Sequence, residues 1–256
     1  KASLSGKLSL AGSTTVQPLA EILGEAFMET HPDVVIEVQG GGTSVGVTAA
    51  GEGTTDIGMA SRALKQSEIE TYPDLEVVTI AVDGIAIIVN PTLNLTNLTR
   101  EQVRRIYAGE ITNYKEVGGP DAPITVVSRE EGSGTRTAFQ ELIMTYTDAT
   151  GEKKEKDITA SALLQQSNGQ VRALVATTPN TIGYVSLGFV DSSVHAVAID
   201  GVTASVENVK SGNYPISRPL NLLTKGTPTE LTQGFIDFVL SDVGQQIVAK
   251  DYVSVR

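Results

Sequence analysis

The chain of 256 residues contains no cysteine and no tryptophan, and it has only two histidines. Without cysteine it can form neither disulfides nor thiolate metal sites, and two histidines are too few for the usual transition-metal ligand sets. No apolar run reaches the roughly 18 residues of a membrane-spanning helix. Aromatic residues make up 5% of the chain, which leaves few stacking platforms for sugars. These shortages argue against a metalloprotein, a membrane-spanning chain and a carbohydrate-binding surface.

The charges are unbalanced toward acid, with 19 Lys and Arg against 30 Asp and Glu, a net charge of −11. Nucleic-acid binding needs a basic stripe that displaces counterions from the phosphate backbone, and none is present. The hydrophobic share of 40% and the 25 glycines are typical of a folded, turn-rich protein. The length is that of one large domain or two ordinary ones.

Strand-like and helix-like runs alternate along the chain and predict an α/β fold with mostly parallel sheets covered on both faces. The length fits two such sheets joined by crossing segments better than one very wide sheet. We place the crossings at Glu76–Val89 and near Ala198–Ser205. The first α/β domain is then formed by residues 1–83 together with 203–256, and the second by residues 84–202.

Three glycine-rich turns repeat one pattern, in which a strand is followed by glycine and hydroxyl residues and then by the start of a helix. A helix N-terminus presents unsatisfied N–H groups and the positive end of the helix dipole. Glycine lets an anion approach the backbone, and hydroxyls add donors without charge. One such turn would be an ordinary helix cap, but three at the carboxyl ends of parallel strands predict an anion site. The turns are Gly12–Thr15, Gly42–Ser44 and Gly132–Thr135.

The third turn also carries charge, because Arg129 and Arg136 flank it. The planar guanidinium fork suits bidentate contact with a tetrahedral oxyanion. Glu131 would repel such an anion, so we expect it to pair with Arg129 or Arg136 and hold the fork in place. The alternative is a solvated charged loop, since surface ion pairs are weak.

Asp56 is the remaining polar candidate. An ionised carboxylate only accepts hydrogen bonds, so in a pocket of donors it would require a ligand that still carries a proton. Phosphate does so near neutral pH and sulfate does not, and we therefore expect Asp56 to select phosphate. The alternative is an aspartate that accepts hydrogen bonds from nearby turn amides.

These segments resemble those of the phosphate-binding proteins that serve Pst-type ABC transporters, and the similarity extends over nearly the whole chain. The resemblance implies two α/β domains of the type II periplasmic binding protein fold, joined by hinge strands around a central cleft and closing over one phosphate. The segments that carry it are LAGSTTVQPL, QGGGTSVG, TDIGMASR, SREEGSGTR, NTIGYVSLG and YPISRPLNLLTKG.

The resemblance also implies the ligand residues, with Ser13 adding a further donor in the first turn. Thr15 stands where some members carry an aromatic residue, and Thr43 where some carry serine. Ser61 and Arg62 are candidates only, because this loop differs among members. The implied phosphate ligands are Thr14, Thr15, Thr43, Ser44, Asp56, Arg129, Ser133, Gly134 and Thr135.

As implied by the resemblance, the protein performs no catalysis and needs neither cofactor nor metal. Its expected partners are inorganic phosphate and the membrane permease subunits of an ABC importer, and the chain is expected to be a monomer. We expect an extracytoplasmic location, with a signal peptide, with or without a lipid anchor, preceding Lys1.

Two other functions remain open from the residues alone. The first is a receptor for another tetrahedral oxyanion, such as arsenate, sulfate, molybdate or tungstate. The second is a phosphate-ester hydrolase, in which Asp56 would be the obvious group to activate water. His31 and His195 lie in a proline turn and in an alternating strand, where we expect structural roles.

Two short motifs lie together near residue 95. Asn94 and Asn97 both begin N-glycosylation acceptor triplets, which arise often by chance. Thr99 and Gln102 predict a capping box, in which each side chain satisfies the other's backbone N–H at the start of a helix.

Overall fold

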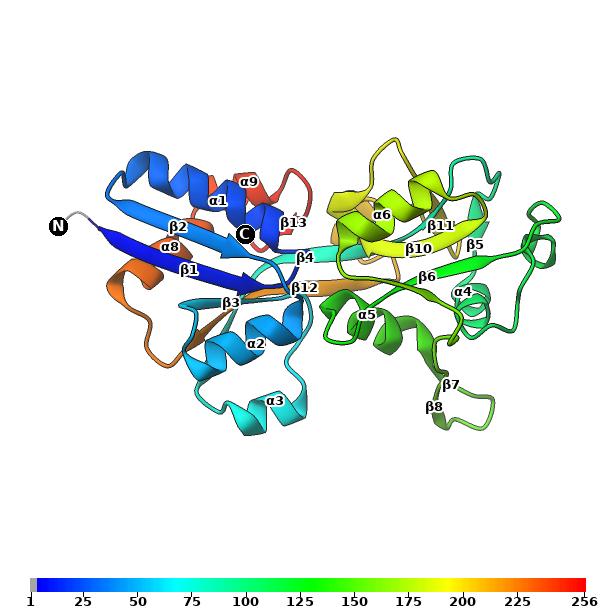
Figure 1. The fold of residues 1–256 in the computed structure, drawn as a ribbon, viewed down its shortest axis with the longest axis horizontal. Helices are drawn as coiled ribbons and strands as arrows, with labels where there is room; N and C mark the ends of the chain where they lie inside the picture. The colour runs from blue at the N-terminus through cyan, green and yellow to red at the C-terminus, as the bar shows by residue number, and fades with distance from the viewer. Residues whose placement is uncertain (1–3) are drawn as a thin grey trace. The chain divides into compact units, whose positions relative to one another are not determined.

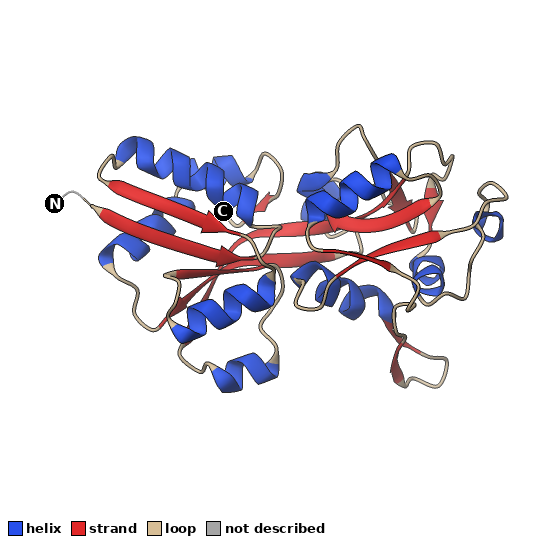
Figure 2. Ribbon diagram, in the orientation of Figure 1, coloured by secondary structure: helices blue, strands red, loops and turns tan. Residues whose placement is uncertain are grey.

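The computed structural model describes residues 4–256, which divide into two compact units (Figure 1). Of the described residues, unit 1 comprises 4–82, 132–134 and 218–256, and unit 2 comprises 83–131 and 135–217. Helices flank the strands in both units, which confirms the α/β class (Figure 2). Among the described residues, no helix is both long and apolar enough to cross a membrane.

Unit 1 is a sheet with helices on its two faces. Its elements are β1 (Gly6–Gly12), α1 (Gln17–Thr30), β2 (Val34–Gln39), α2 (Thr43–Glu52), β3 (Ile57–Ala60), α3 (Gln66–Thr71), the first half of β4 (Leu75–Val89), nearly all of β12 (Ser217–Lys225), α8 (Glu230–Val239), α9 (Asp242–Val248) and β13 (Val253–Ser254).

The strand order in unit 1 brings the carboxyl ends of three strands together. β1 lies between β2 and β3 and is parallel to both, with Ala11 opposite Gln39 and Gly12 opposite Met59. β12 continues the sheet antiparallel to β3. Since parallel strands end at the same edge of a sheet, the turns that follow β1, β2 and β3 share that edge.

The two faces of the unit 1 sheet bury different residues. On one face the apolar residues of β1 and β3 pack under α1, α8 and α9, where Phe27 meets Phe235 edge to face at 5.6 Å. On the other face Val47 and Ala50 of α2 pack against Ala60 of β3. Figure 1 shows α1 and α2 on opposite sides of β1.

In unit 2, β4 lies between β10 and β11 and is antiparallel to both, while β10 is parallel to β6. Its elements are the second half of β4, β5 (Asn97–Leu98), α4 (Arg100–Tyr107), the 3-10 helix η1 (Tyr114–Val117), β6 (Thr125–Arg129), α5 (Gly134–Phe139), the π-helix η2 (Gln140–Met144), β7 (Thr145–Thr147), β8 (Lys153–Glu155), β9 (Leu163–Gln165), α6 (Asn168–Thr177), β10 (Thr181–Ser186), the 3-10 helix η3 (Leu187–Phe189), β11 (His195–Ile199) and α7 (Val206–Lys210).

The unit boundaries differ from the predicted ones at the second crossing. The first boundary lies between Val82 and Asp83, one residue from the predicted position. The second lies between Ser217 and Arg218, whereas we had placed it after residue 202. The residues between these positions pack within unit 2, where the Tyr214 hydroxyl donates to the carbonyl of Ile85 at 2.8 Å.

Candidate functional site

The turn after β1 is built around a glycine. Gly12 has φ +132°, and a Cβ there would overlap the backbone of Gly46 and Met59. The Ser13 N–H donates to the carbonyl of Met59 at 2.9 Å, and the Ser13 hydroxyl accepts the N–H of Thr15 at 3.1 Å. Ser13 therefore fixes the first turn at the end of β3.

The turn after β2 is tied to the first turn and opens α2. The Gly42 N–H donates to the carbonyl of Gly12 at 2.9 Å. Thr43 is the first residue of α2 and is fully buried. Its Oγ1 accepts the N–H of Ser61 at 3.1 Å and lies 3.2 Å from the Ser61 Oγ. The second turn therefore joins the ends of β1 and β3.

The third turn contributes residues 132–134 to unit 1. The Ser44 N–H donates to the carbonyl of Gly132 at 3.1 Å. Gly134 lies so close to the hydroxyls of Thr43 and Ser61 that a Cβ at Gly134 would overlap both. All three predicted turns therefore contribute to one cluster in unit 1, which we call the hydroxyl cluster. It comprises Ser13, Thr14, Thr15, Thr43, Ser44, Ser61, Ser133 and Gly134.

The hydroxyl cluster has the chemistry of an anion site without a carboxylate. Ser13, Thr43, Ser61 and Ser133 are each at most 2% exposed. α2 begins at the cluster with no side-chain cap, so its positive dipole end lies among the hydroxyls. A hydroxyl can donate and accept hydrogen bonds at once, so the cluster can donate to the oxygens of an oxyanion and also accept a hydrogen bond from a protonated one.

Asp56 does not belong to the hydroxyl cluster, which corrects the prediction that it faces the same turns. Ile57, the next residue, begins β3 opposite Leu10, so Asp56 lies at the amino end of β3, away from the carboxyl end where Ser61 follows. Asp56 is exposed, and its Oδ2 accepts both the N–H and the hydroxyl of Ser9 at 2.8 Å. The alternative interpretation, an aspartate satisfied by local backbone and hydroxyl donors, is the one that this geometry supports.

Two of the predicted ligands, Arg129 and Thr135, belong to unit 2, and their role in binding stays a prediction. Arg129 donates from Nε and Nη2 to the two carboxylate oxygens of Glu130 at 2.8 and 2.9 Å. The expected partner Glu131 is exposed and forms no ion pair with any residue in 4–256. Glu130, which directly follows Arg129, is therefore the carboxylate that holds the fork, and the pairing through Glu131 was wrong.

Tyr184 and Arg136 form hydrogen bonds with the backbone of Arg129. The Tyr184 hydroxyl accepts the N–H of Arg129 at 3.2 Å and lies 2.8 Å from the Ser128 hydroxyl. Burial raises the pKa of Tyr184 to about 12, although the hydrogen bonds with Ser128 and Arg129 oppose the rise. Arg136 donates to the carbonyl of Arg129 at 2.9 Å. Tyr184 thus stays neutral at physiological pH and supports the end of β6 through hydrogen bonds.

The structure adds residues that sequence reasoning left out. Ser61, named only as a candidate, shares its hydrogen bonds with Thr43. Arg218 of unit 1 was not identified, although it lies in YPISRPLNLLTKG, one of the segments that carry the resemblance. It is 3% exposed, and its Nη2 donates to Thr15 Oγ1 at 3.0 Å. The Thr15 side chain therefore accepts a hydrogen bond from a buried arginine, and its role in phosphate binding stays a prediction.

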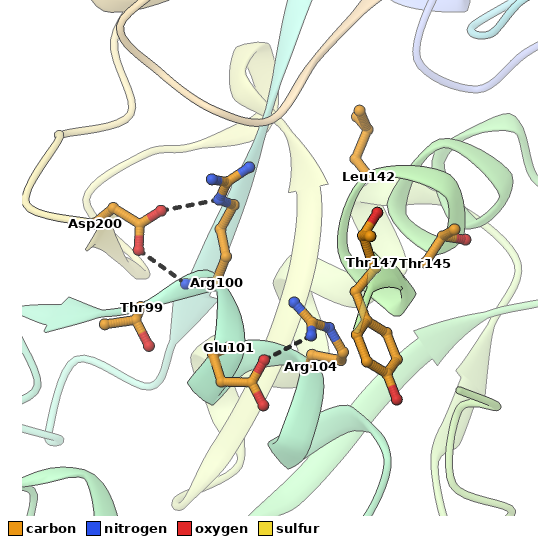
Figure 3. A pocket seen from close by; sticks show the side chains of 9 residues that line it. Thr99, Arg100, Glu101, Arg104, Leu142, Thr145, Thr147 and Asp200 are labelled. Atoms are coloured by element: carbon orange, nitrogen blue, oxygen red, sulfur yellow. Dashed lines mark hydrogen bonds and ion pairs between the residues drawn. The ribbon is translucent and has the colours of Figure 1, made fainter. Parts of the chain in front are cut away.

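A pocket of about 460 Å³ in unit 2 contains none of the predicted ligands (Figure 3). Its charged side chains pair with one another, since Arg100 Nε donates to Asp200 at 2.9 Å and Arg104 Nη1 donates to Glu101 at 2.6 Å. The pocket therefore offers an anion no uncompensated charge. Its lining residues are Thr99, Arg100, Glu101, Arg104, Leu142, Thr145, Tyr146, Thr147 and Asp200.

The histidines show no catalytic arrangement. The ring of His31 stacks on Phe27 with centroids 4.1 Å apart, and its Nδ1 lies 3.0 Å from the carbonyl of Phe27. His195 is exposed at the start of β11. Among residues 4–256, no group of three histidine or carboxylate side chains gathers in a way that could hold a metal ion.

The sequence is similar to those of known binding proteins. Residues 1–243 match the PBP superfamily domain. The chain is 34% identical over 248 residues to the phosphate-binding protein PstS of Bacillus subtilis, a match that covers 96% of this chain and 79% of that protein.

Two solved structures are similar over almost the full length. A Clostridium perfringens crystal structure, described as a phosphate ABC transporter substrate-binding protein with bound phosphate, has a TM-score of 0.91 and 45% identity. The match covers 98% of this chain and 100% of that one. An ABC-type phosphate transport receptor from Vibrio cholerae has a TM-score of 0.78 and 36% identity over 97% of this chain and 100% of its own.

Proposed function

The chain belongs to the PstS family of phosphate-binding proteins, within the PBP superfamily, and on that premise we propose that it binds inorganic phosphate and delivers it to an ABC-type importer. The observation that carries the proposal is the hydroxyl cluster of unit 1. Thr43, Ser61 and Gly134 come from three separate segments of the chain, and their close packing leaves hydroxyl and amide donors at one edge of the sheet.

The donor set suits a dehydrated tetrahedral anion. Hydrogen bonds to a charged group contribute roughly 1.5–3 kcal/mol each, so about ten of them would exceed the roughly 8 kcal/mol of a micromolar site, and the excess offsets removal of water from the anion. The net charge of −11 does not oppose binding, because remote carboxylates are screened over about 8 Å at physiological salt.

Isothermal titration calorimetry of phosphate-free protein tests the proposal. We expect phosphate to bind with one-to-one stoichiometry, while arsenate, sulfate and molybdate, titrated at pH 6 and pH 8, define the selectivity. Since Asp56 lies outside the hydroxyl cluster, the Asp56→Asn variant should bind phosphate as the wild type does. Absence of phosphate binding, or tighter binding of sulfate or molybdate, would refute the proposal.

The protein acts as a receptor in this proposal and leaves the anion chemically unchanged. Thr43 Oγ1 and Ser13 Oγ accept backbone N–H groups, and no histidine or carboxylate is a hydrogen-bond partner of either among residues 4–256. Incubation with an aryl phosphate should therefore give no turnover. Release of the phenol by purified protein would contradict this reading.

The partners and the location follow from the same proposal. A receptor of an importer works outside the cytoplasmic membrane, where it hands its ligand to the permease subunits. We expect the chain to be a monomer, which sedimentation of the phosphate-loaded protein will check. Phosphate uptake by vesicles that contain the cognate permease should depend on added receptor.

A further inference from the structure

Arg62 is a buried cation at the carboxyl end of β3, directly after Ser61. It is 2% exposed, and its Nη1 and Nη2 donate to the two carboxylate oxygens of Glu68, each at 2.7 Å. Nη1 also donates to the carbonyl of Ala63 at 2.9 Å. The Nε of Arg62 is buried and has no hydrogen-bond partner among residues 4–256.

The strand geometry brings Arg62 to the end of the unit where the hydroxyl cluster lies. Ala60, the last residue of β3, packs against α2, and Arg62 follows two residues later in the bend that begins at Ser61. α2 begins after the carboxyl end of β2 and ends before β3, so the carboxyl end of β3 lies beside the N-terminus of α2. Thr43 is located there, in contact with Ser61.

The ion pair between Arg62 and Glu68 attaches α3 to the rest of unit 1. α3 has no buried residue, and it is attached through Glu68, which also accepts the N–H of Lys65 at 2.8 Å. Figure 1 shows α3 beside α2 on this face of unit 1. A buried ion pair gives little net stability compared with apolar residues of similar size, and an unpaired buried N–H has a cost of its own. The stability of unit 1 therefore does not explain this arrangement.

We propose that Arg62 strengthens phosphate binding by supplying a buried positive charge beside the hydroxyl cluster, while Glu68 holds its fork, offsets part of its charge and leaves Nε–H as the remaining donor. This inference rests on the proposed function. The hydroxyl cluster supplies donors without net charge, and Arg62 adds a cation whose field is little screened because water is excluded from it. Arg218, which contacts Thr15, is a second buried cation of unit 1. Asn221 Nδ2 donates to the carbonyl of Arg62 at 3.1 Å and fixes its backbone to β12.

Three variants and a matched control separate this role from a merely structural one. Arg62→Gln with Glu68→Gln replaces the ion pair by neutral side chains that can still hydrogen-bond. Glu68→Gln alone leaves the Arg62 charge uncompensated. Arg62→Lys keeps the charge and loses the fork. The control, Lys7→Gln with Glu37→Gln, neutralises an ion pair of unit 1 whose side chains are 63% and 50% exposed.

Phosphate titration of each protein by calorimetry, with thermal melting to confirm folding, gives the test. We expect the neutral double variant to bind phosphate at least about tenfold more weakly. Glu68→Gln should bind about threefold more tightly, because the cation is no longer offset. Arg62→Lys should fall between the wild type and the double variant, and the control should match the wild type.

Two results would overturn the proposal while the protein remains a phosphate receptor. One is wild-type affinity in the folded double variant. The other is an equal loss of affinity in Glu68→Gln and in the double variant, which would mean that the ion pair only positions Ser61. If the wild type itself binds no phosphate, the proposed function and this inference are both refuted.

Discussion

Thr43 lies at the centre of the candidate site, where it contacts Ser61 and lies close to Gly134. Its Oγ1 accepts the buried N–H of Ser61, so its own proton is available either to the Ser61 Oγ at 3.2 Å or to an anion. A hydroxyl in this position can also accept a hydrogen bond from a protonated ligand. The cluster therefore needs no carboxylate to accommodate protonated phosphate, which is consistent with the position of Asp56 at the far end of β3.

Removal of this hydroxyl tests the site at the scale of one residue. Thr43→Val keeps the shape of the side chain and leaves the Ser61 N–H without its acceptor. We expect phosphate affinity to fall at least about tenfold and unit 1 to lose about 1–3 kcal/mol of stability. Thr43→Ser retains the hydroxyl and should keep affinity within about threefold of the wild type. Calorimetry and chemical denaturation measure the two effects, and equal affinity of the valine and serine variants would exclude Thr43 as a ligand.

The ionisation of Glu68 makes the stability of unit 1 depend on pH. Burial alone would raise its pKa, but hydrogen bonds from Arg62 and from the Lys65 N–H outweigh burial and hold the pKa below the ordinary value of 4.5. A carboxyl with a lowered folded-state pKa stabilises the fold at pH values above its unfolded pKa, and this contribution is lost as pH falls through the folded value. Melting temperature followed from pH 7 to pH 3 should therefore drop less steeply in Glu68→Gln than in the wild type. Parallel curves would show that Glu68 is not part of the acid transition.

Asp56 shows why single residues were harder to place than turns. TDIGMASR contains an acidic residue and a Ser-Arg pair only a few positions apart, and the sequence does not show which of them reaches the end of the strand. The answer depends on the register of β3, in which Ile57 lies opposite Leu10. That register is set by pairing with residues nearly fifty positions away. We therefore expected Asp56 to face the three turns, which it does not, and gave Ser61 too little weight.

At the scale of elements, the local signals and the gathering of the three glycine turns were predicted correctly, whereas the second unit boundary differs from the predicted one. Thr99 and Gln102 form the expected capping box at the start of α4, where the Gln102 N–H donates to Thr99 Oγ1 at 3.1 Å. The three glycine turns also lie where the pattern predicted them. The return crossing was misplaced because it depends on which sheet the residues before Ser217 pack against, and nothing local encodes that choice.

The close approach of Gly134 to α2 gives a test at the element scale. A Cβ at this position would overlap the hydroxyls of Thr43 and Ser61, so Gly134→Ala must push the third turn away from the cluster. We expect phosphate affinity to fall at least about tenfold while the melting temperature changes little. Gly169→Ala, in helix α6, is the matched control, because its Cβ would meet only the Ser167 Oγ at 3.8 Å. Calorimetry that finds both alanine variants equal to the wild type would show that the turn does not need this approach.

At the scale of the whole molecule, phosphate binding should raise the free energy of unfolding. A ligand that binds only the folded state adds about 2.7 kcal/mol at a hundredfold excess over its dissociation constant. For a chain of this size that gives a rise in melting temperature of roughly 5–10 °C with phosphate. Potassium sulfate at the same ionic strength is the control and should shift it by less than half as much. Equal shifts with both salts would indicate a general anion effect.

A crystal structure of the protein grown in phosphate is the decisive test of whether phosphate binds at the hydroxyl cluster. We predict tetrahedral density with oxygens within hydrogen-bond distance of Thr43 Oγ1 and of the Ser133 backbone. Phosphate seated elsewhere, for example in the pocket lined by Arg100 and Arg104, with none at Thr43, would contradict it.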